Sequence, residues 1–293
     1  MFRKALHLKN GLAQITAGLL TVVTWMIGLP VRAQDQSNLV EMINEFRASP
    51  GRCAGGQSSA ASALAPDPAL AKVRMSPGGN LQSALKDAGF QAEIAEAISV
   101  TGPASPAAAM ATIKDRYCKS LLRPEYAAIG VSRNARAWHI VLAKPLLAHD
   151  LGDAFKAGRD VLALVNAARS EPRMCGNRKF PVAPPVTWNE KLARTALAHS
   201  ADMANRNYFS HEAKDGSTVG ARAQRHGYRW RNIGENLAAG QGSAQLAVSG
   251  WLSSPGHCAN LMNRGFKEMG AAYALNRKSD MSIYWTQVFG TAR

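Results

Sequence analysis

Residues 43–53 have the sequence Ile-Asn-Glu-Phe-Arg-Ala-Ser-Pro-Gly-Arg-Cys, and residues 165–175 have the sequence Val-Asn-Ala-Ala-Arg-Ser-Glu-Pro-Arg-Met-Cys. Asn, Arg, Pro and Cys occupy the same four places in both segments. Further along, Cys118-x-x-Leu matches Cys258-x-x-Leu in the same order. Repetition over this distance predicts two copies of one folding unit rather than a single large domain.

The two copies differ in the residues that can carry chemistry. The second copy contains His211 and His257, whereas the first has Tyr117 at the place of His257. Residues 70–89 correspond to residues 192–227, so the first copy is 16 residues shorter in the region that holds His211. Features that both copies share are therefore candidates for the scaffold, and features of one copy are candidates for function.

Apolar spacing predicts the local structure of both copies. The chain has 293 residues, of which 46% are hydrophobic, enough for two folded domains. Helical periodicity and N-cap residues predict helices over residues 39–46, 161–168, 190–203 and 243–252. Runs of strand-forming residues predict two hairpins, 128–131 with 138–142 and 269–275 with 281–289. The polar segments between their strands, including residues 133–136, are expected as turns, and the Ala/Ser/Gly-rich segment 55–65 as a loose loop.

The first 33 residues have the pattern of an export signal. Arg3, Lys4 and Lys9 precede an uncharged apolar run over residues 11–30, and a small-x-small cleavage pattern ends at Ala33. A retained membrane anchor is the alternative, because about 20 apolar residues can span a bilayer. Both interpretations place the protein outside the cytoplasm, in the periplasm or secreted. No later segment is expected to cross a membrane.

The sequence predicts three folded or connecting segments after the signal. They are a first domain over residues 34–145, a linker over residues 146–156 and a second domain over residues 157–293. In an exported protein the four cysteines are expected to be oxidised. Of the three possible pairings, the repeat favours Cys53–Cys118 and Cys175–Cys258, and a cysteine-ligated metal is the weaker alternative.

The net charge of +15 is concentrated in the second copy. Residues 151–293 contain 19 basic and 10 acidic residues, a balance of +9, whereas residues 34–150 contain 12 and 10. A basic exported domain is attracted to anionic envelope polymers or lipid head groups. A nucleic-acid partner is not expected, because the sequence has no aromatic-basic recognition motif.

Three polar residues of the second copy follow apolar segments in turn-like settings. They are His211 in Phe-Ser-His, Glu235 in Gly-Glu-Asn and His257 in Ser-Pro-Gly-His. Two imidazoles and a carboxylate suit a divalent cation, with zinc the first candidate, and leave a position for water or ligand. The same groups could instead transfer protons. His139, His149 and His226 are expected to be structural or on the surface. His199 is expected to be buried and hydrogen-bonded on a helix face, with support of the cleft as the alternative.

The second copy resembles the CAP superfamily of cysteine-rich secretory, antigen 5 and pathogenesis-related proteins. The resemblance rests on these segments: Asn207-Tyr208-Phe209-Ser210-His211, Gly234-Glu235-Asn236-Leu237, Ser254-Pro255-Gly256-His257 and Tyr284-Trp285-Thr286-Gln287-Val288-Phe289-Gly290. It implies an α+β fold of tandem α-β-α sandwiches, the first shortened and degenerate. It also implies a cleft that contains His211, Glu235 and His257. The fourth cleft position, often glutamate in eukaryotic members, is Ser254, and the first copy has only Glu96 near the place of Glu235.

Two functions remain open on these grounds. The first is a non-catalytic module whose cleft binds a divalent cation or a small ligand. The second is a metal-assisted hydrolase of peptide or cell-wall bonds, with His211 and His257 holding the metal and Glu235 as the general base. The absence of a serine or cysteine nucleophile motif and the presence of Ser254 favour the binding module. The first copy is expected to be a scaffold or docking partner, so removing residues 34–150 should leave cation binding intact.

Overall fold

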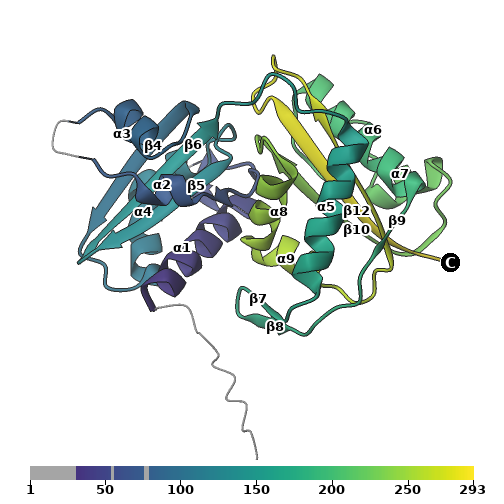
Figure 1. Ribbon diagram of the computed structural model, residues 1–293, viewed down its shortest axis with the longest axis horizontal. Helices are drawn as coiled ribbons and strands as arrows, with labels where there is room; N and C mark the ends of the chain where they lie inside the picture. Colours follow the sequence, from purple (N-terminus) through teal and green to yellow (C-terminus); the bar gives the residue numbers. More distant parts are fainter. Residues whose placement is uncertain (1–30, 54–55, 76–78) are drawn as a thin grey trace, which may run out of the picture.

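The computed structural model of the chain describes residues 31–53, 56–75 and 79–293. The predicted export signal, residues 1–33, lies outside these ranges except for its last three residues, which open the first helix. The described chain forms two halves, each built around its own four-stranded sheet, that lie side by side (Figure 1). Helices and strands both contribute, as the predicted α+β class requires.

The C-terminal half contains a sheet with the strand order β10-β12-β11-β9. The strands of this sheet are β9 (Thr187–Trp188), β10 (Trp230–Ala239), β11 (Glu268–Leu275) and β12 (Ile283–Ala292). Two further strands of this half, β7 (Arg173–Cys175) and β8 (Arg178–Phe180), form a separate small hairpin. The helices of the C-terminal half are α5 (Ala154–Arg169), α6 (Glu190–Arg206), α7 (Val219–Arg225), α8 (Ala244–Leu252) and α9 (Pro255–Leu261). The strand β10 is therefore an edge strand.

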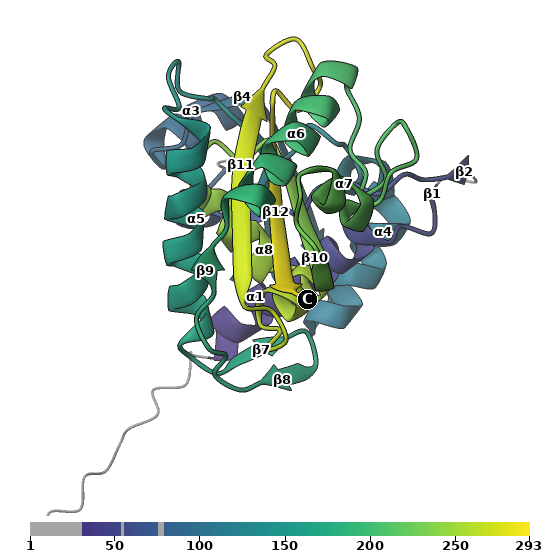
Figure 2. The ribbon, with the colours of Figure 1, turned by 90° about the vertical axis from the view of Figure 1, so that its right-hand side faces the viewer.

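Alternating side chains of the central strand β12 build the two cores of this half. Trp285 and Phe289 pack against α5 and α8 on one face, whereas Val288 packs against α6 on the other. Successive residues of a strand point to opposite faces, so one strand can serve both layers. Figure 2 shows the result, with α6 in front of β11 and β12 and α8 behind them. The layers form an α-β-α sandwich.

The N-terminal half has a sheet with the corresponding order β4-β6-β5-β3. Its strands are β1 (Arg52–Cys53), β2 (Gly56–Gln57), β3 (Ala65–Pro66), β4 (Ala92–Thr101), β5 (Ala128–Asn134) and β6 (Ala137–Pro145). Its helices are α1 (Val31–Ala48), α2 (Pro68–Lys72), α3 (Leu81–Asp87) and α4 (Pro106–Leu121). In both sheets the short strand, β3 or β9, pairs in parallel and the other pairs are antiparallel.

Two asparagines, the buried Asn44 and the half-buried Asn166, make matching hydrogen bonds in the two halves. The amide of Asn44 donates to the carbonyl of Leu64 and accepts from its N–H, at 3.0 and 2.8 Å. Asn166 does the same with Val186, at 2.9 Å for both bonds. The residues repeated in the sequence thus have matching contacts, while a tandem pair of CAP-like domains stays a prediction.

Both predicted disulfides are present. Cys53–Cys118 joins β1 to α4, and Cys175–Cys258 joins β7 to α9, with Cα–Cα distances of 5.8 and 5.5 Å. None of the four cysteines is free. Loops of 65 and 83 residues are closed in this way, and cross-links over such lengths stabilise a fold by about 4 kcal/mol.

The predicted helices and hairpins are confirmed, and Asn189 caps α6 by accepting from the N–H groups of Lys191 and Leu192. The predicted turn over residues 133–136 is too long. Strands β5 and β6 pair as far as Asn134 and Ala137, and Ala135 adopts a φ of 50° in the tight turn between them. The predicted linker 146–156 is also too long, because α5 begins at Ala154.

The segment 55–65 is not a loose loop throughout, because residues 61–65 are buried between the two halves. Ser62 Oγ accepts a hydrogen bond from the N–H of Ala239 at 3.0 Å, and the carbonyl of Ala63 accepts one from the side chain of Gln241 at 2.8 Å. Small side chains let the backbone approach its neighbour closely here. The composition that predicted a loop instead serves an interface.

Among the described residues, no helix combines the length and the apolar character needed to cross a bilayer.

Candidate functional site

The structure brings the four predicted cleft residues together. His211, Glu235, Ser254 and His257 all line one cleft of about 890 Å³. They come from a loop, a strand and the start of a helix, in three separate parts of the C-terminal half. The cleft lies along β10, where the edge of the sheet lets the two helical layers meet.

His211 enters the cleft from the loop after α6. Asn207 ends that helix in the left-handed conformation, with a φ of 49°, and turns the chain toward β10. The imidazole is 61% exposed, and its Nδ1 lies 2.8 Å from Oε1 of Glu235, whose side chain is only 2% exposed. A carboxylate on Nδ1 fixes the orientation of the ring, so Nε2 is the atom that faces a ligand.

Glu235 lies in the edge strand β10, so the prediction that it occupies a turn is wrong. Its second carboxylate oxygen accepts a hydrogen bond at 2.7 Å from Arg222, which is also buried. Arg222 in turn donates to the carbonyls of His211 and Ser217, at 3.0 and 2.6 Å. Buried charges need such pairing, because water is not available to solvate them. Arg222 thus holds both the carboxylate and the histidine loop.

His257 lies in the first turn of α9 rather than in a loop, as the Ser-Pro-Gly sequence had suggested. Proline fits the first turn of a helix, where its missing N–H has no partner to lose. Nδ1 of His257 lies 2.9 Å from the hydroxyl of Ser254, which precedes the helix. Burial, and secondarily the nearby His211, lower the pKa of His257 to about 4. This imidazole is therefore neutral at physiological pH.

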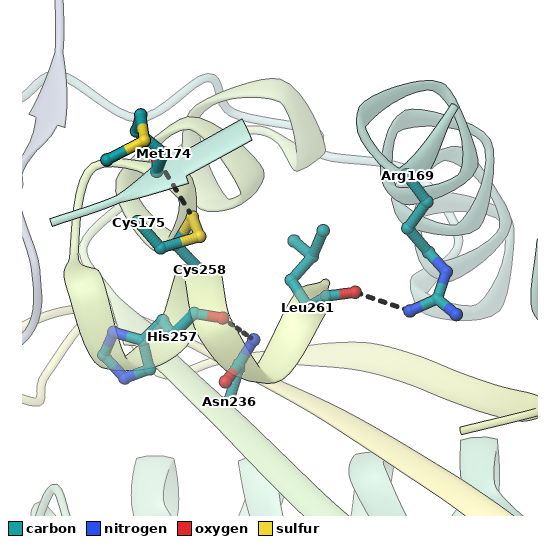
Figure 3. Close-up of a disulfide and its surroundings, with 7 residues drawn as sticks. All are labelled: Arg169, Met174, Cys175, Asn236, His257, Cys258 and Leu261. Carbon is teal, nitrogen blue, oxygen red and sulfur yellow. Dashed lines mark hydrogen bonds between the residues drawn. A yellow bond between two sulfur atoms is a disulfide. The ribbon is translucent and has the colours of Figure 1, made fainter. Parts of the chain in front are cut away.

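Several bonds hold α9 and hence His257 in place (Figure 3). The disulfide Cys175–Cys258 follows His257 directly, and Asn236 donates to the carbonyl of His257 at 3.3 Å. Arg169, from the end of α5, donates to the carbonyl of Leu261 at 2.6 Å. The helix is only seven residues long, so its position depends on these cross-links rather than on its own stability.

The segment Gly234-Glu235-Asn236 serves both sides of β10. Glu235 faces the α6 and α7 side, where it meets Arg222, and Asn236 faces α9. A Cβ on Gly234 would lie 2.7 Å from Oδ1 of Asn260 and 2.6 Å from the ring of Phe266. The absence of a side chain at Gly234 therefore lets the α9 region approach the strand.

His199 is buried, as its helical spacing predicts. Its Nε2 lies 2.9 Å from the carbonyl of Ser210, so the ring supports the loop that carries His211. Burial is the main cause that lowers the pKa of His199, which stays neutral.

Glu96 does not occupy the place of Glu235 in the N-terminal half. When the two sheets are aligned on β6 and β12, Ala97 is level with Glu235 and Glu96 is level with Gly234. A shift of one residue turns a side chain to the other face of a strand. Glu96 accordingly accepts a hydrogen bond from Ser120 of α4 at 2.6 Å.

Other residues of the cleft were not predicted from the sequence. Arg222, which does not line the cleft but holds Glu235, carries no motif that distinguishes it from other arginines on helices. Further wall residues include Arg178, Asn236, Asn260, Arg264 and, from the N-terminal half, Glu45, Ala48 and Ser49. The N-terminal half therefore contributes to the wall of the cleft, while its predicted role as a scaffold or docking partner stays a prediction.

Comparison with known sequences matches residues 162–289 to the cysteine-rich secretory protein family, CAP. Residues 162–289 are a CAP domain. The resemblance inferred from the histidine and glutamate segments is thus confirmed for the C-terminal half. The CAP domain contains every predicted cleft residue and the Cys175–Cys258 disulfide.

Relatives of the CAP domain have been found in bacteria. The uncharacterized protein YkwD of Bacillus subtilis is 29% identical over 131 residues, which are 45% of this chain and 46% of YkwD. The uncharacterized membrane protein YlbC of the same organism is 34% identical over 104 residues, 36% of this chain and 28% of YlbC. The chain thus spans less than half the length of either relative.

A solved structure described as an extracellular protein containing an SCP domain, from Bacillus anthracis, is 26% identical to this chain. The match covers 53% of this chain and 52% of that protein, with a TM-score of 0.40.

Proposed function

We propose that the chain is an exported binding module whose CAP domain takes up a divalent cation or a small ligand in the cleft. One observation carries the proposal: His211 and His257 line the same cleft, and each has its Nδ1 engaged by a neighbouring side chain. Engagement of Nδ1 leaves Nε2 of both imidazoles for the ligand. Two rings prepared in this way from different elements point to binding rather than to chance proximity.

The two histidines fit a cation site with open positions. Metal binding requires neutral imidazole, and the lowered pKa of His257 keeps it neutral. A carboxylate partner on the remote nitrogen is typical of metal-bound histidine, and Glu235 occupies this place for His211. The hydroxyl of Ser254 engages the same nitrogen of His257. Imidazole ligands suit zinc. A bound cation would supply a positive charge to an oxygen of the ligand.

The donor set is small. Within the described ranges, no group of three or more His, Cys, Asp and Glu side chains comes together as a metal cluster. Both oxygens of Glu235 already accept hydrogen bonds, from His211 and Arg222. A cation would therefore have two protein ligands, and water or a ligand would complete its shell. Such a site binds weakly and exchanges readily, which suits recognition.

A metal-assisted hydrolase is the alternative function for this cleft. It requires a group that accepts a proton from the attacking water, and Glu235 is the sequence candidate. Because Glu235 is held by Arg222 and His211 inside the fold, its oxygens are not placed to contact water. The geometry therefore supports binding over hydrolysis. The basic charge of residues 151–293 supports an anionic envelope polymer or lipid head group as the surface on which the protein acts.

Calorimetric titration of the chelator-treated full chain with zinc tests the proposal. We expect one site per chain, a loss of at least tenfold in affinity for His211→Ala and for His257→Ala, and no loss for His149→Ala, whose side chain is exposed outside the cleft. Equal affinities of all four proteins, or no binding of zinc, manganese, magnesium or calcium at millimolar concentration, would overturn the cation site. Zinc-dependent cleavage of peptide or cell-wall substrates, lost in both cleft variants, would favour the hydrolase.

Export is tested separately by cell fractionation and by sequencing the N-terminus of the mature protein. The two disulfides support an oxidising compartment. We expect the mature chain to begin at Gln34, after the small-x-small pattern. A cytoplasmic protein with four reduced cysteines would contradict export.

A further inference from the structure

One part of the cleft wall comes from outside the CAP domain. Glu45, Ala48 and Ser49, at the end of α1, line the same cleft as His211 and His257. The site is therefore shared between the two halves of the chain. This part of the wall exists because the N-terminal half packs against the CAP domain with the end of α1 at the cleft.

Buried bonds fix α1 at the cleft. The amide of Asn44, which is fully buried, donates at 3.0 Å to the carbonyl of Ser253 in the other half. Because Asn44 precedes Glu45 and Ser253 precedes Ser254, this bond holds Glu45 near the Ser254 end of the cleft. Glu45 is exposed, so it gives the cleft an accessible acidic group in addition to the buried Glu235.

The cleft has unpaired charges of both signs. The side chain of Glu45 is exposed and forms no ion pair with any described residue. Arg178 and Arg264 line the cleft as well, are exposed and have no carboxylate partner in the described part of the chain. The guanidinium of Arg178 lies 5.0 Å from the centre of the Phe180 ring, which restricts its position.

We propose that the cleft binds a peptide segment that carries both a carboxylate and an ammonium group. Glu45 recognises the ammonium group, and Arg178 and Arg264 recognise the carboxylate. A simple polyanion fits less well, because Glu45 repels it. A cleft of about 890 Å³ falls within the range of about 300–1,000 Å³ typical of small-ligand sites. The inference rests on the proposed binding function and names its ligand class.

The test uses the full chain and three capped peptides. The first is acetyl-Ala-Glu-Lys-Ala-amide, the second has acetylated lysine, and the third has glutamine in place of glutamate. We expect lysine acetylation to weaken binding of the peptide to the wild type about threefold to fivefold. The Glu45→Gln variant should bind the peptides with and without the acetyl group equally. The double variant Arg178→Gln/Arg264→Gln should likewise bind the peptides with glutamate and with glutamine equally.

Two variants serve as matched controls. Glu41 lies one turn before Glu45 on α1, and Lys179 follows Arg178 on β8, but neither lines the cleft. Glu41→Gln and Lys179→Gln should discriminate among the peptides as the wild type does. Equal effects of Glu41→Gln and Glu45→Gln, or no binding of the first peptide at millimolar concentration, would overturn the inference.

Cation binding is measured on the same proteins to separate this inference from the proposed cation site. Glu45→Gln should bind zinc as the wild type does, because Glu45 is not among the proposed ligands. Peptide discrimination without any zinc binding would sink the cation site and support the peptide site. The opposite result is that zinc binds but each peptide has the same affinity for Glu45→Gln as for the wild type. That result would support the cation site and overturn the peptide site.

Discussion

Arg47 and Arg169 make three matching hydrogen bonds in the two halves of the chain. The Nε of Arg47 donates to the carbonyl of Ser62 at 2.7 Å, and the Nε of Arg169 donates to the carbonyl of Pro184 at 2.8 Å. Each Nη1 donates to the carbonyl that ends a helix, Leu121 of α4 or Leu261 of α9. Each buried arginine thus ties the first helix of its half to a helix that is distant in sequence.

Replacing either arginine should lower stability, but only the Arg169 variant should lose zinc affinity. Arg169→Met should lower the free energy of unfolding by about 3–5 kcal/mol, because buried carbonyls lose a charged donor. It should also weaken zinc binding, because α9 carries His257. Arg47→Met should destabilise the N-terminal half and leave zinc affinity within about twofold of the wild type. Urea denaturation and calorimetric titration measure the two effects, and a loss of zinc affinity in both variants would contradict this division.

Glu235 positions His211, and its replacement should reveal this role. Glu235→Gln removes the carboxylate from Nδ1 of His211, and loss of such an outer partner typically costs about tenfold to 100-fold in metal affinity. Arg222→Met should destabilise the fold by about 3–5 kcal/mol, since it leaves the carboxylate of Glu235 buried without its cation. It should also weaken zinc binding, because Arg222 holds the loop that carries His211. Zinc titration and thermal denaturation distinguish the two. Unchanged zinc affinity in Glu235→Gln would argue against the positioning role.

His257 should make the stability of the metal-free protein depend on pH. Its pKa is about 4 in the folded protein, below the value of about 6.5 expected in the unfolded chain. The unfolded chain therefore binds an extra proton between these values, so the free energy of unfolding should fall as the pH drops from about 6.5 to 4, by at most about 3 kcal/mol. His257→Gln should lack this component. Denaturation in the presence of a chelator measures it, and identical pH profiles would contradict it.

A side chain at Gly234 should lower the stability of the fold. Gly234→Ala places a Cβ within 2.7 Å of Asn260 and 2.6 Å of Phe266, and overpacking of this kind costs about 1–3 kcal/mol. Gly256→Ala is the matched control, because nothing lies within 4 Å of its added Cβ. Thermal denaturation of both variants checks the difference. A Gly234→Ala protein as stable as Gly256→Ala would mean that α9 can move away from β10 at little cost.

Much of the local structure was predictable, because it depends on residues close in sequence. The spacing of Leu192, Ala196 and Met203 predicts α6, and Asn189 is its cap. The repeated cysteines predict both disulfides. The settings of Glu235 and His257 were misjudged for a physical reason: Gly-Glu-Asn and Ser-Pro-Gly-His are typical of turns, but here Gly234 allows close packing of a strand and Pro255 begins a helix.

The sequence by itself singled out the candidate residues of the proposed site, since only the second copy has His211, Glu235 and His257, and it favoured the cysteine pairing that the structure shows. These properties follow from residue identity and spacing along the chain. Tertiary structure alone decided that β10 is an edge strand, that Arg222 holds Glu235, and that α1 brings Glu45 to the cleft. Those relationships depend on strand pairing and on the packing of two halves, which join residues far apart in sequence.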